Sequence, residues 1–390
     1  MTKNPAHLKP SSKSSRKPSN AIPRSKRSLV VAVVALAVLV VGVAGFALLR
    51  PAGTSASAAQ KPPVPPLYVV GTTPAANATG VTASSPITVT FSAPLSSSSP
   101  KPSITPAVPG NWTSASPTEL EFVPAGPLVP GSSEKITVPG GATGALGTKH
   151  QTMIAPYTAS FTVAQGSTLR LQQLLAELGY LPLNFTPASQ PSSPQQEADP
   201  QVGTFAWRWP NQPPSLTSLW SPGVPNVITN GAVMSFEAQH GLPWNGAPTG
   251  TAFWTALLQA ASTGAADPLP YGYVLVSKQL PETATVYQNG VVKYTTLANT
   301  GVPAAPTANG TFPVYARYTS TTMSGTNPNG TKYVDPGIPW VSYFNGGDAL
   351  HGFVRASYGF PQSVGCVEMP PAHAAVVFPM TPIGTLVTVQ

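Results

Sequence analysis

The sequence predicts a mainly β, multidomain chain that is anchored in a membrane. Three observations support this fold class. Only 8% of the 390 residues are charged, whereas 48 are proline and 34 are glycine, which is typical of β-rich domains joined by stiff linkers. One unbroken apolar run lies near the N-terminus. Beyond it the hydrophobic residues recur with a period of two, except in one central stretch that has a helical period.

The positive charge is confined to the N-terminal fifty residues. The formal net charge is +8, but nine of the 20 Lys and Arg residues lie in residues 1–50, which contain no Asp or Glu. The rest of the chain holds 11 basic and 12 acidic side chains, so we expect no nucleic-acid binding by its body. Residues 1–28 are polar, basic and rich in Ser and Pro, and we expect a disordered cytoplasmic tail there.

Residues 29–49 form a run of 21 apolar residues. At about 1.5 Å per residue, such a helix crosses a hydrocarbon core of about 30 Å. Because the positive charge precedes it, the N-terminus should stay in the cytoplasm and the later domains should lie outside the cell membrane. A cleaved signal peptide is the alternative, since Ala56-Ser57-Ala58 resembles a cleavage site, but signal peptides usually carry only about 7–15 apolar residues. We therefore predict a single-pass anchor, followed by a Pro-rich linker over residues 50–67.

Residues 68–164 alternate apolar and polar side chains in short runs, which Pro, Gly and Ser clusters separate. This period of two with regular turns predicts an antiparallel β-sandwich. The segment that starts at Ser85, SPITVTFS, resembles the opening of bacterial Ig-like domains. The resemblance implies an Ig-like β-sandwich, for which we favour a spacer role over ligand binding.

Residues 167–263 change to a helical period. Four leucines share one helical face: Leu171, Leu174, Leu175 and Leu178. Gly179 follows them and is expected to end the helix as its C-terminal cap. A second helix is expected from near Thr229 to Gly241, and a third near residues 249–258. Helices this short must share a core, so we predict a small three-helix domain.

This helical pattern resembles a peptidoglycan-binding three-helix domain. The likeness rests on the leucine pattern before Gly179, on the run that ends in Phe236-Glu237-Ala238-Gln239-His240-Gly241, and on the Thr-Gly-Thr and Trp pattern near residue 250. A Trp-rich insertion over residues 185–228 interrupts it. The resemblance implies that this domain contacts the cell wall.

Residues 269–390 again have the β pattern. A strand is expected over 273–276, and a hairpin over 285–294 with Asn289-Gly290 at its tip, the strongest short hairpin signal. Further strands are expected over 312–318, 340–344, 350–354 and 384–389. These strands predict a second β-sandwich.

Cys366 is the only cysteine of the chain, and it follows Gly365 in a tight turn. A nucleophilic thiolate needs a base that removes its proton and main-chain N–H groups that hold the oxyanion. His351, fifteen residues upstream on an expected strand, and the Gly-Cys turn supply these groups. A buried, inert cysteine is the alternative. One cysteine excludes an intramolecular disulfide and a Cys-based zinc or iron–sulfur site, and we expect neither a metal nor a cofactor.

From Tyr273 to the C-terminus, the ordered motifs resemble the catalytic domain of the L,D-transpeptidases, the YkuD-like family. The motifs are the hairpin, the turn at 306–312, the pair His351-Gly352 and the run Ser363-x-Gly365-Cys366-Val367. The resemblance implies a β-sandwich in the bacterial envelope whose cysteine attacks the third-residue carbonyl of a peptidoglycan stem peptide and expels D-alanine. An amine of a neighbouring stem would then resolve the thioester and form a 3→3 cross-link. Carbapenem β-lactams are implied as covalent inhibitors.

The resemblance also implies roles for single residues. Cys366 would be the nucleophile and His351 the base, which the carbonyl of Gly352 orients. The N–H groups of Gly365 and Cys366 would form the oxyanion hole. Five further residues occupy positions that contact substrate in the family: Tyr333, Gly346, Gly347, Ser363 and Glu368.

Two positions depart from the family pattern. Val364 stands where the motif usually has a histidine, and Glu368 stands where it usually has Asn or Arg. A Glu beside a thiolate raises the thiol pKa unless it points away, so we expect activity that is slower than usual. Two other functions stay open: a non-catalytic wall-binding scaffold, which Val364 and the accessory domains suggest, and an L,D-carboxypeptidase that uses water as acceptor.

Overall fold

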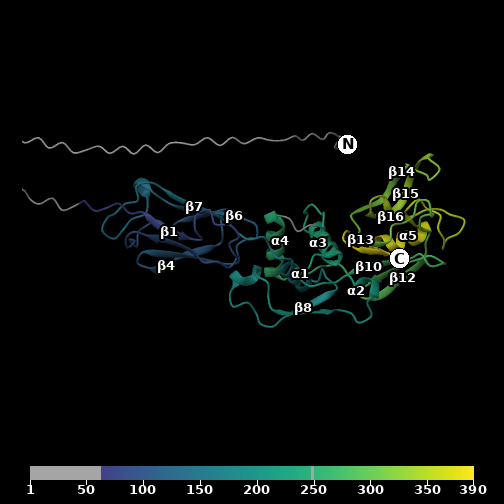
Figure 1. The fold of residues 1–390 in the computed structure, drawn as a ribbon, viewed down its shortest axis with the longest axis horizontal. Helices are drawn as coiled ribbons and strands as arrows, with labels where there is room; N and C mark the ends of the chain where they lie inside the picture. Colours follow the sequence, from purple (N-terminus) through teal and green to yellow (C-terminus); the bar gives the residue numbers. More distant parts are fainter. Residues whose placement is uncertain (1–62, 247–249) are drawn as a thin grey trace, which may run out of the picture. The chain divides into compact units, whose positions relative to one another are not determined.

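The structure is a computed structural model that describes residues 63–246 and 250–390 (Figure 1). The predicted cytoplasmic tail, the predicted transmembrane segment at 29–49 and the linker up to residue 62 lie outside the described residues. Within the described ranges, every helix is too short or too polar to span a bilayer. The described residues all belong to one compact unit.

The first domain is the predicted β-sandwich. Its pairings are antiparallel, and its inner side chains come from alternating positions such as Ile87, Val89 and Phe91, which are buried. One sheet has the order β1 (Val69–Thr73), β2 (Ile87–Phe91), β5 (Glu119–Pro124), β4 (Gly110–Ser116). The other has the order β3 (Ser103–Thr105), β6 (Ser133–Val138), β7 (Tyr157–Thr162).

Three longer helices follow, as predicted: α1 (Thr168–Glu177), α3 (Val227–Gln239) and α4 (Gly250–Thr263). Gly179 ends the first with a positive φ of 83°, which suits glycine. The second begins earlier than the predicted Thr229, because the Asn226 side chain accepts a hydrogen bond from the Thr229 N–H at 2.9 Å and caps the helix.

The insertion between these helices folds onto both the helices and the last domain. It contains the hairpin β8 (Leu183–Pro187) and β9 (Gly203–Trp207) and the short α2 (Pro214–Thr217). The hydroxyls of Ser215 and Tyr273 are hydrogen-bonded at 2.8 Å, and a Cβ on Gly290 would meet Trp209. One hydrophobic core contains helix residues such as Phe236 together with Tyr273 and Leu386 of the last domain.

The last domain is the predicted second β-sandwich. One sheet has the order β12 (Val291–Leu297), β11 (Thr283–Gln288), β10 (Gly272–Ser277), β18 (Leu386–Val389), β13 (Gly310–Pro313). The other has the order β14 (Ala316–Thr326), β15 (Lys332–Asn345), β16 (Asp348–Gly352), β17 (Val367–Met369). α5 (Pro371–Val377) packs against β15 and β16. Buried valines from both sheets, with Phe344 and Leu350, form the core between them.

Two sequence predictions have different outcomes in this domain, and one feature was not predicted. The Asn289-Gly290 hairpin is confirmed, since both residues have positive φ, 50° and 75°. The strand expected over 312–318 is wrong, because the chain crosses between sheets at the buried Val314 and so divides into β13 and β14. The length of the β14–β15 hairpin, up to Thr326 and from Lys332, was not predicted.

Candidate active site

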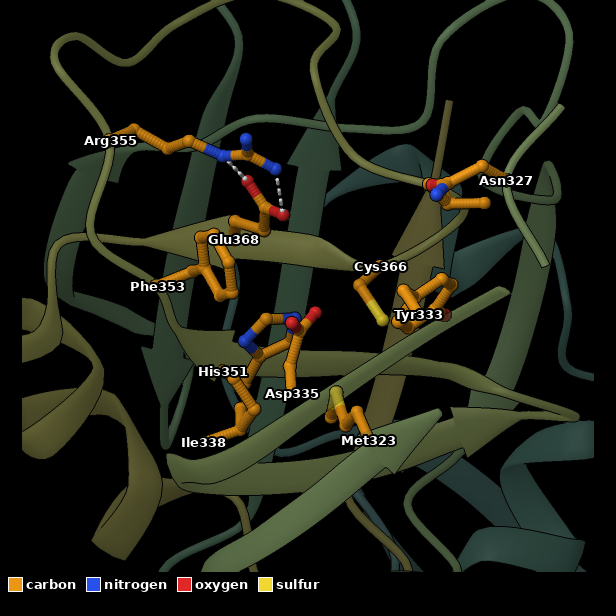
Figure 2. A pocket seen from close by; sticks show the side chains of 11 residues that line it. Met323, Asn327, Tyr333, Asp335, Ile338, His351, Phe353, Arg355, Cys366 and Glu368 are labelled. Atoms are coloured by element: carbon orange, nitrogen blue, oxygen red, sulfur yellow. Dashed lines mark hydrogen bonds and ion pairs between the residues drawn. The ribbon is translucent and has the colours of Figure 1, made fainter. Parts of the chain in front are cut away.

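Two adjacent parallel strands bring the predicted nucleophile and base together. In the register of β16 and β17, Leu350 faces Val367 and His351 faces Glu368. Side chains alternate along a strand, so Cys366, one residue before β17, lies on the same face as Glu368 and His351. All three line one cavity of about 270 Å³. Figure 2 shows the Cys366 sulfur and the His351 ring in this cavity.

The β14–β15 hairpin supplies the opposite wall of the cavity. Met323, Tyr333 and Asp335 line it, and Met323 pairs with Asp335 across the hairpin. Gly325 pairs with Tyr333, and a Cβ on Gly325 would lie 2.6 Å from the Tyr333 hydroxyl. The glycine thus leaves room for the tyrosine ring to cross the neighbouring strand, and a larger residue would displace the ring.

The His351 ring is buried and held in one orientation. Its Nδ1 lies 3.1 Å from the carbonyl oxygen of Gly352. A carbonyl only accepts, so Nδ1 carries the proton and Nε2 keeps a free lone pair. Burial lowers the pKa of His351, while the hydrogen bond to Gly352 opposes this shift. The imidazole is therefore neutral near pH 7 and able to accept a proton.

The Cys366 thiol is protonated at rest. Burial raises its pKa to about 12, and the negative charges of Asp348 and Glu368 add to the increase, whereas a hydrogen bond from the Ala349 main chain opposes it. The effect of Glu368 has the direction that the sequence predicted. Because so little thiolate exists near pH 7, this sulfur needs a base to become nucleophilic.

Three glycines lie near the sulfur, and each makes a different contact. Gly365 has a φ of 111°, and a Cβ there would lie 2.5 Å from Oδ1 of Asp348, so only glycine fits. The Cys366 Sγ contacts the Gly347 carbonyl oxygen at 3.6 Å, and the Gly346 carbonyl accepts a hydrogen bond from the Tyr315 hydroxyl. The predicted contacts of Gly346 and Gly347 with substrate, and the oxyanion-hole role of Gly365, stay predictions.

Ser363 lies beneath the turn that carries Cys366. Its side chain is only 1% exposed, and its hydroxyl donates to the Cys366 carbonyl oxygen at 2.5 Å. The Thr307 hydroxyl points at the same carbonyl from 3.4 Å and accepts the Gly301 N–H at 2.8 Å. Ser363 therefore holds the Cys366 carbonyl from beneath the turn and does not line the cavity, and its contact with substrate stays a prediction.

Further buried polar groups extend this support beneath the turn. The Glu282 carboxylate accepts the N–H of Thr300 at 2.6 Å and its hydroxyl at 2.7 Å. The main chains of Asn299 and Glu368 exchange two hydrogen bonds of 2.9 Å. We call the set Glu282, Asn299, Thr300, Thr307 and Ser363 the polar frame. It ties the turn and β17 to the loop after β12.

Sequence reasoning missed two charged residues of the cavity. Arg355 binds the Glu368 carboxylate through two hydrogen bonds, Nε to Oε2 at 2.8 Å and Nη2 to Oε1 at 2.7 Å. Its guanidinium also lies over the Phe353 ring. The acidic residue in place of Asn or Arg was the available signal, since a buried carboxylate needs a partner. The second missed residue is Asp335 on β15.

The sequence comparisons agree with this geometry. Residues 271–389 match the model of the YkuD family, the L,D-transpeptidase catalytic domain. The last domain is therefore similar to L,D-transpeptidase catalytic domains. Residues 63–163 match the model of a bacterial Ig-like domain. Both predicted resemblances are thereby confirmed, whereas that of the helical domain to peptidoglycan-binding domains stays a prediction.

Solved structures similar to the chain also carry L,D-transpeptidase names. The NMR structure of the catalytic domain of an E. faecium L,D-transpeptidase is 27% identical, with a TM-score of 0.29, and covers 32% of this chain and 100% of its own. An L,D-transpeptidase from Mycobacterium smegmatis is 16% identical, with a TM-score of 0.27, and covers 84% and 100%. L,D-transpeptidase 3 from Mycobacterium tuberculosis, in complex with a faropenem-derived adduct, is 14% identical, with a TM-score of 0.29, and covers 83% and 97%. No curated protein matches the chain.

Proposed function

We propose that the chain forms 3→3 cross-links in peptidoglycan through a Cys366 acyl-enzyme. One observation carries the proposal: Cys366 and His351 share a cavity in an L,D-transpeptidase catalytic domain, and the Gly352 carbonyl leaves Nε2 of His351 free to act as base. The protonated thiol and the neutral imidazole form a matched donor and acceptor.

In the acylation step, Nε2 of His351 takes the thiol proton while Sγ attacks the carbonyl carbon of the third stem residue. The N–H groups of Gly365 and Cys366 stabilise the oxyanion. The imidazolium then gives its proton to the departing D-alanine amine, which leaves a thioester on Cys366. The polar frame contributes by fixing the turn that carries the sulfur.

An amine of a neighbouring stem resolves the thioester and restores the thiol. Water in the same place would release a tripeptide stem, which is the L,D-carboxypeptidase reaction. Tyr333, Gly346, Gly347 and Glu368 contact the stems in this proposal. Residues 29–49 anchor the chain in the cell membrane, and the Ig-like and helical domains lie with the catalytic domain on the outer side, where the wall is.

A carbapenem tests the proposal directly. The purified full-length chain should gain the mass of one intact carbapenem, and Cys366→Ala should gain none, because the chain contains no other thiol. A tetrapeptide stem should then give a cross-linked product when an amine acceptor is present. Absence of both the adduct and turnover would favour the non-catalytic scaffold, and release of tripeptide with no cross-linking would favour the carboxypeptidase.

A further inference from the structure

The cavity beside Cys366 contains two carboxylates in different electrostatic states. Glu368 is nearly buried and is neutralised by the two hydrogen bonds from Arg355. Asp335 lines the same cavity from β15. No residue within 63–246 or 250–390 donates a hydrogen bond to its carboxylate or forms an ion pair with it.

The direction of the Asp335 side chain follows from its strand. Tyr333 and Asp335 are half-buried and alternate with Val334 and Pro336, which are exposed, so the first two face the cavity. The charge of this carboxylate acts on His351, Tyr333 and Arg355, which line the same cavity. Figure 2 shows it between the hairpin and the His351 ring.

The charges in the cavity leave one negative charge uncompensated. Arg355 balances Glu368, and the buried imidazole of His351 is neutral near pH 7. The Asp335 carboxylate is then the attractive site for a cation that enters the cavity. The proposed reaction requires such a cation, because a primary amine acceptor is an ammonium ion near pH 7.

We propose that Asp335 is the binding site for the ammonium group of the acceptor. The inference rests on the proposed function and assigns the second half of the reaction to a residue of the β14–β15 hairpin. The carboxylate holds the ammonium by charge-assisted hydrogen bonds next to the thioester and to Nε2 of His351.

The transfer step is balanced by the groups present. The ammonium gives one proton to Nε2 of His351, and the free amine then attacks the thioester carbonyl carbon. A C–N bond forms and the C–S bond breaks. The nitrogen loses its second proton to the departing thiolate, which restores the thiol, and the imidazolium releases its proton to water.

A different role for Asp335 makes an opposite prediction. Its charge also favours the imidazolium of His351, which forms during acylation. If that were its function, loss of the charge would slow acylation by any donor. The acceptor role predicts that loss of the charge impairs the use of a charged acceptor far more than it slows acylation.

The experiment separates the two half-reactions in the full-length chain. Acylation is followed by intact mass with a carbapenem, and transfer is followed with a tetrapeptide donor and a soluble primary amine. Asp335→Asn should acylate within about twofold of the wild-type rate and need an about tenfold higher amine concentration for half-maximal transfer, because an ion-paired hydrogen bond is lost. Transfer to hydroxylamine, which is uncharged near pH 7, should not change.

Matched variants locate the effect. Asp335→Glu keeps the charge and should recover most of the amine use, whereas Val334→Asn, on the exposed face of the same strand, should behave as wild type. An unchanged amine requirement in Asp335→Asn, or a proportional loss of acylation, would overturn the acceptor role while leaving the proposed function standing. A wild-type chain that forms no adduct and no product would overturn both. If Asp335→Asn does not fold, the comparison is made between Asp335→Glu, which keeps the negative charge, and Asp335→Lys, which reverses it. Equal amine concentrations for half-maximal transfer in these two variants would overturn the acceptor role.

Discussion

The two β-sandwiches of the chain bury different kinds of side chain. The Ig-like sandwich is filled by apolar side chains such as Ile87, Leu120 and Phe161, and Glu134 is its one buried charged residue within the described ranges. The catalytic sandwich has a similar apolar core, but it also buries the polar frame, His351 and Glu368. The same architecture thus encloses an almost wholly apolar interior in one case and a polar frame beneath the Cys366 turn in the other, and buried hydrogen bonds make the difference.

If buried polar groups distinguish the catalytic sandwich, the largest loss of acylation rate should come from removal of the proposed base, His351. His351→Ala should lower acylation by a carbapenem at least about 100-fold, because nothing else in the cavity removes the thiol proton efficiently. The rate of adduct formation by intact mass measures this. His373→Ala is the matched control, since that ring bonds Thr296 outside the cavity and should leave the rate unchanged. A normal rate in His351→Ala would refute the base assignment.

In the Ig-like sandwich, a core substitution should lower stability and leave acylation unchanged. Leu120 is only 3% exposed, so Leu120→Ala should lower the free energy of unfolding of that domain by about 2–5 kcal/mol. Acylation of the folded chain should stay at the wild-type rate. Chemical denaturation, with Val123→Ala at an exposed position as control, measures the loss. If Leu120→Ala slowed acylation at a temperature where the chain is folded, the core of the Ig-like sandwich would influence the reaction, and the two sandwiches would not be independent.

Ser363→Ala tests the polar frame itself. The Cys366 carbonyl would keep only the long contact to Thr307, so the turn should gain freedom and acylation should fall by about tenfold. Ser342→Ala removes another buried hydroxyl contact of the same sandwich, the one to Thr381. It should lower the melting temperature by a similar amount without slowing acylation. Equal rates in the two variants would show that the frame does not position the sulfur.

Arg355→Ala should have a smaller effect. It leaves the Glu368 charge without its partner, which raises the pKa of the Cys366 thiol further and should slow acylation by about fivefold. The double variant Arg355→Ala/Glu368→Gln should regain most of the rate, since the uncompensated charge is then gone. Failure of the double variant to recover would mean that Arg355 acts on the donor and not through Glu368.

Val364→His should have the smallest effect. Val364 is 37% exposed at the cavity, and the base position is already filled by His351, so acylation should stay within about twofold of wild type or rise. The carbapenem adduct rate measures the change. A loss of more than tenfold would show that residue 364 packs against a group the reaction needs.

The sequence predicted the parts of the catalytic domain that have local signals. The Asn289-Gly290 hairpin, the strand that carries His351 and the tight Gly365-Cys366 turn are all in place. The long β14–β15 hairpin was missed because residues 319–337 are rich in Thr, Ser, Gly, Asn and Pro, which favour turns when read locally. These strands are held by pairing with each other and with β16, which is tertiary information.

The charged residues of the cavity were missed for the same physical reason. Asp335 stands in Val-Asp-Pro-Gly, which is typical of a turn, and only strand pairing reveals that it faces the sulfur. Arg355 lies in the loop after β16 and meets Glu368 only in the folded chain. Motif spacing located the nucleophile and the base, whereas the groups that tune them come from segments without a motif.

The core that helix residues share with Tyr273 and Leu386 has a practical consequence. A shortened protein cut just before residue 271, where the family match begins, would expose Tyr273 and Leu386 to water and would lose Trp209, which packs against Gly290. Such a fragment should aggregate or lose rigidity. A protein prepared for inhibitor screening should therefore keep the helices attached. The family match begins at residue 271, but the hydrophobic core of the folded unit includes residues before it.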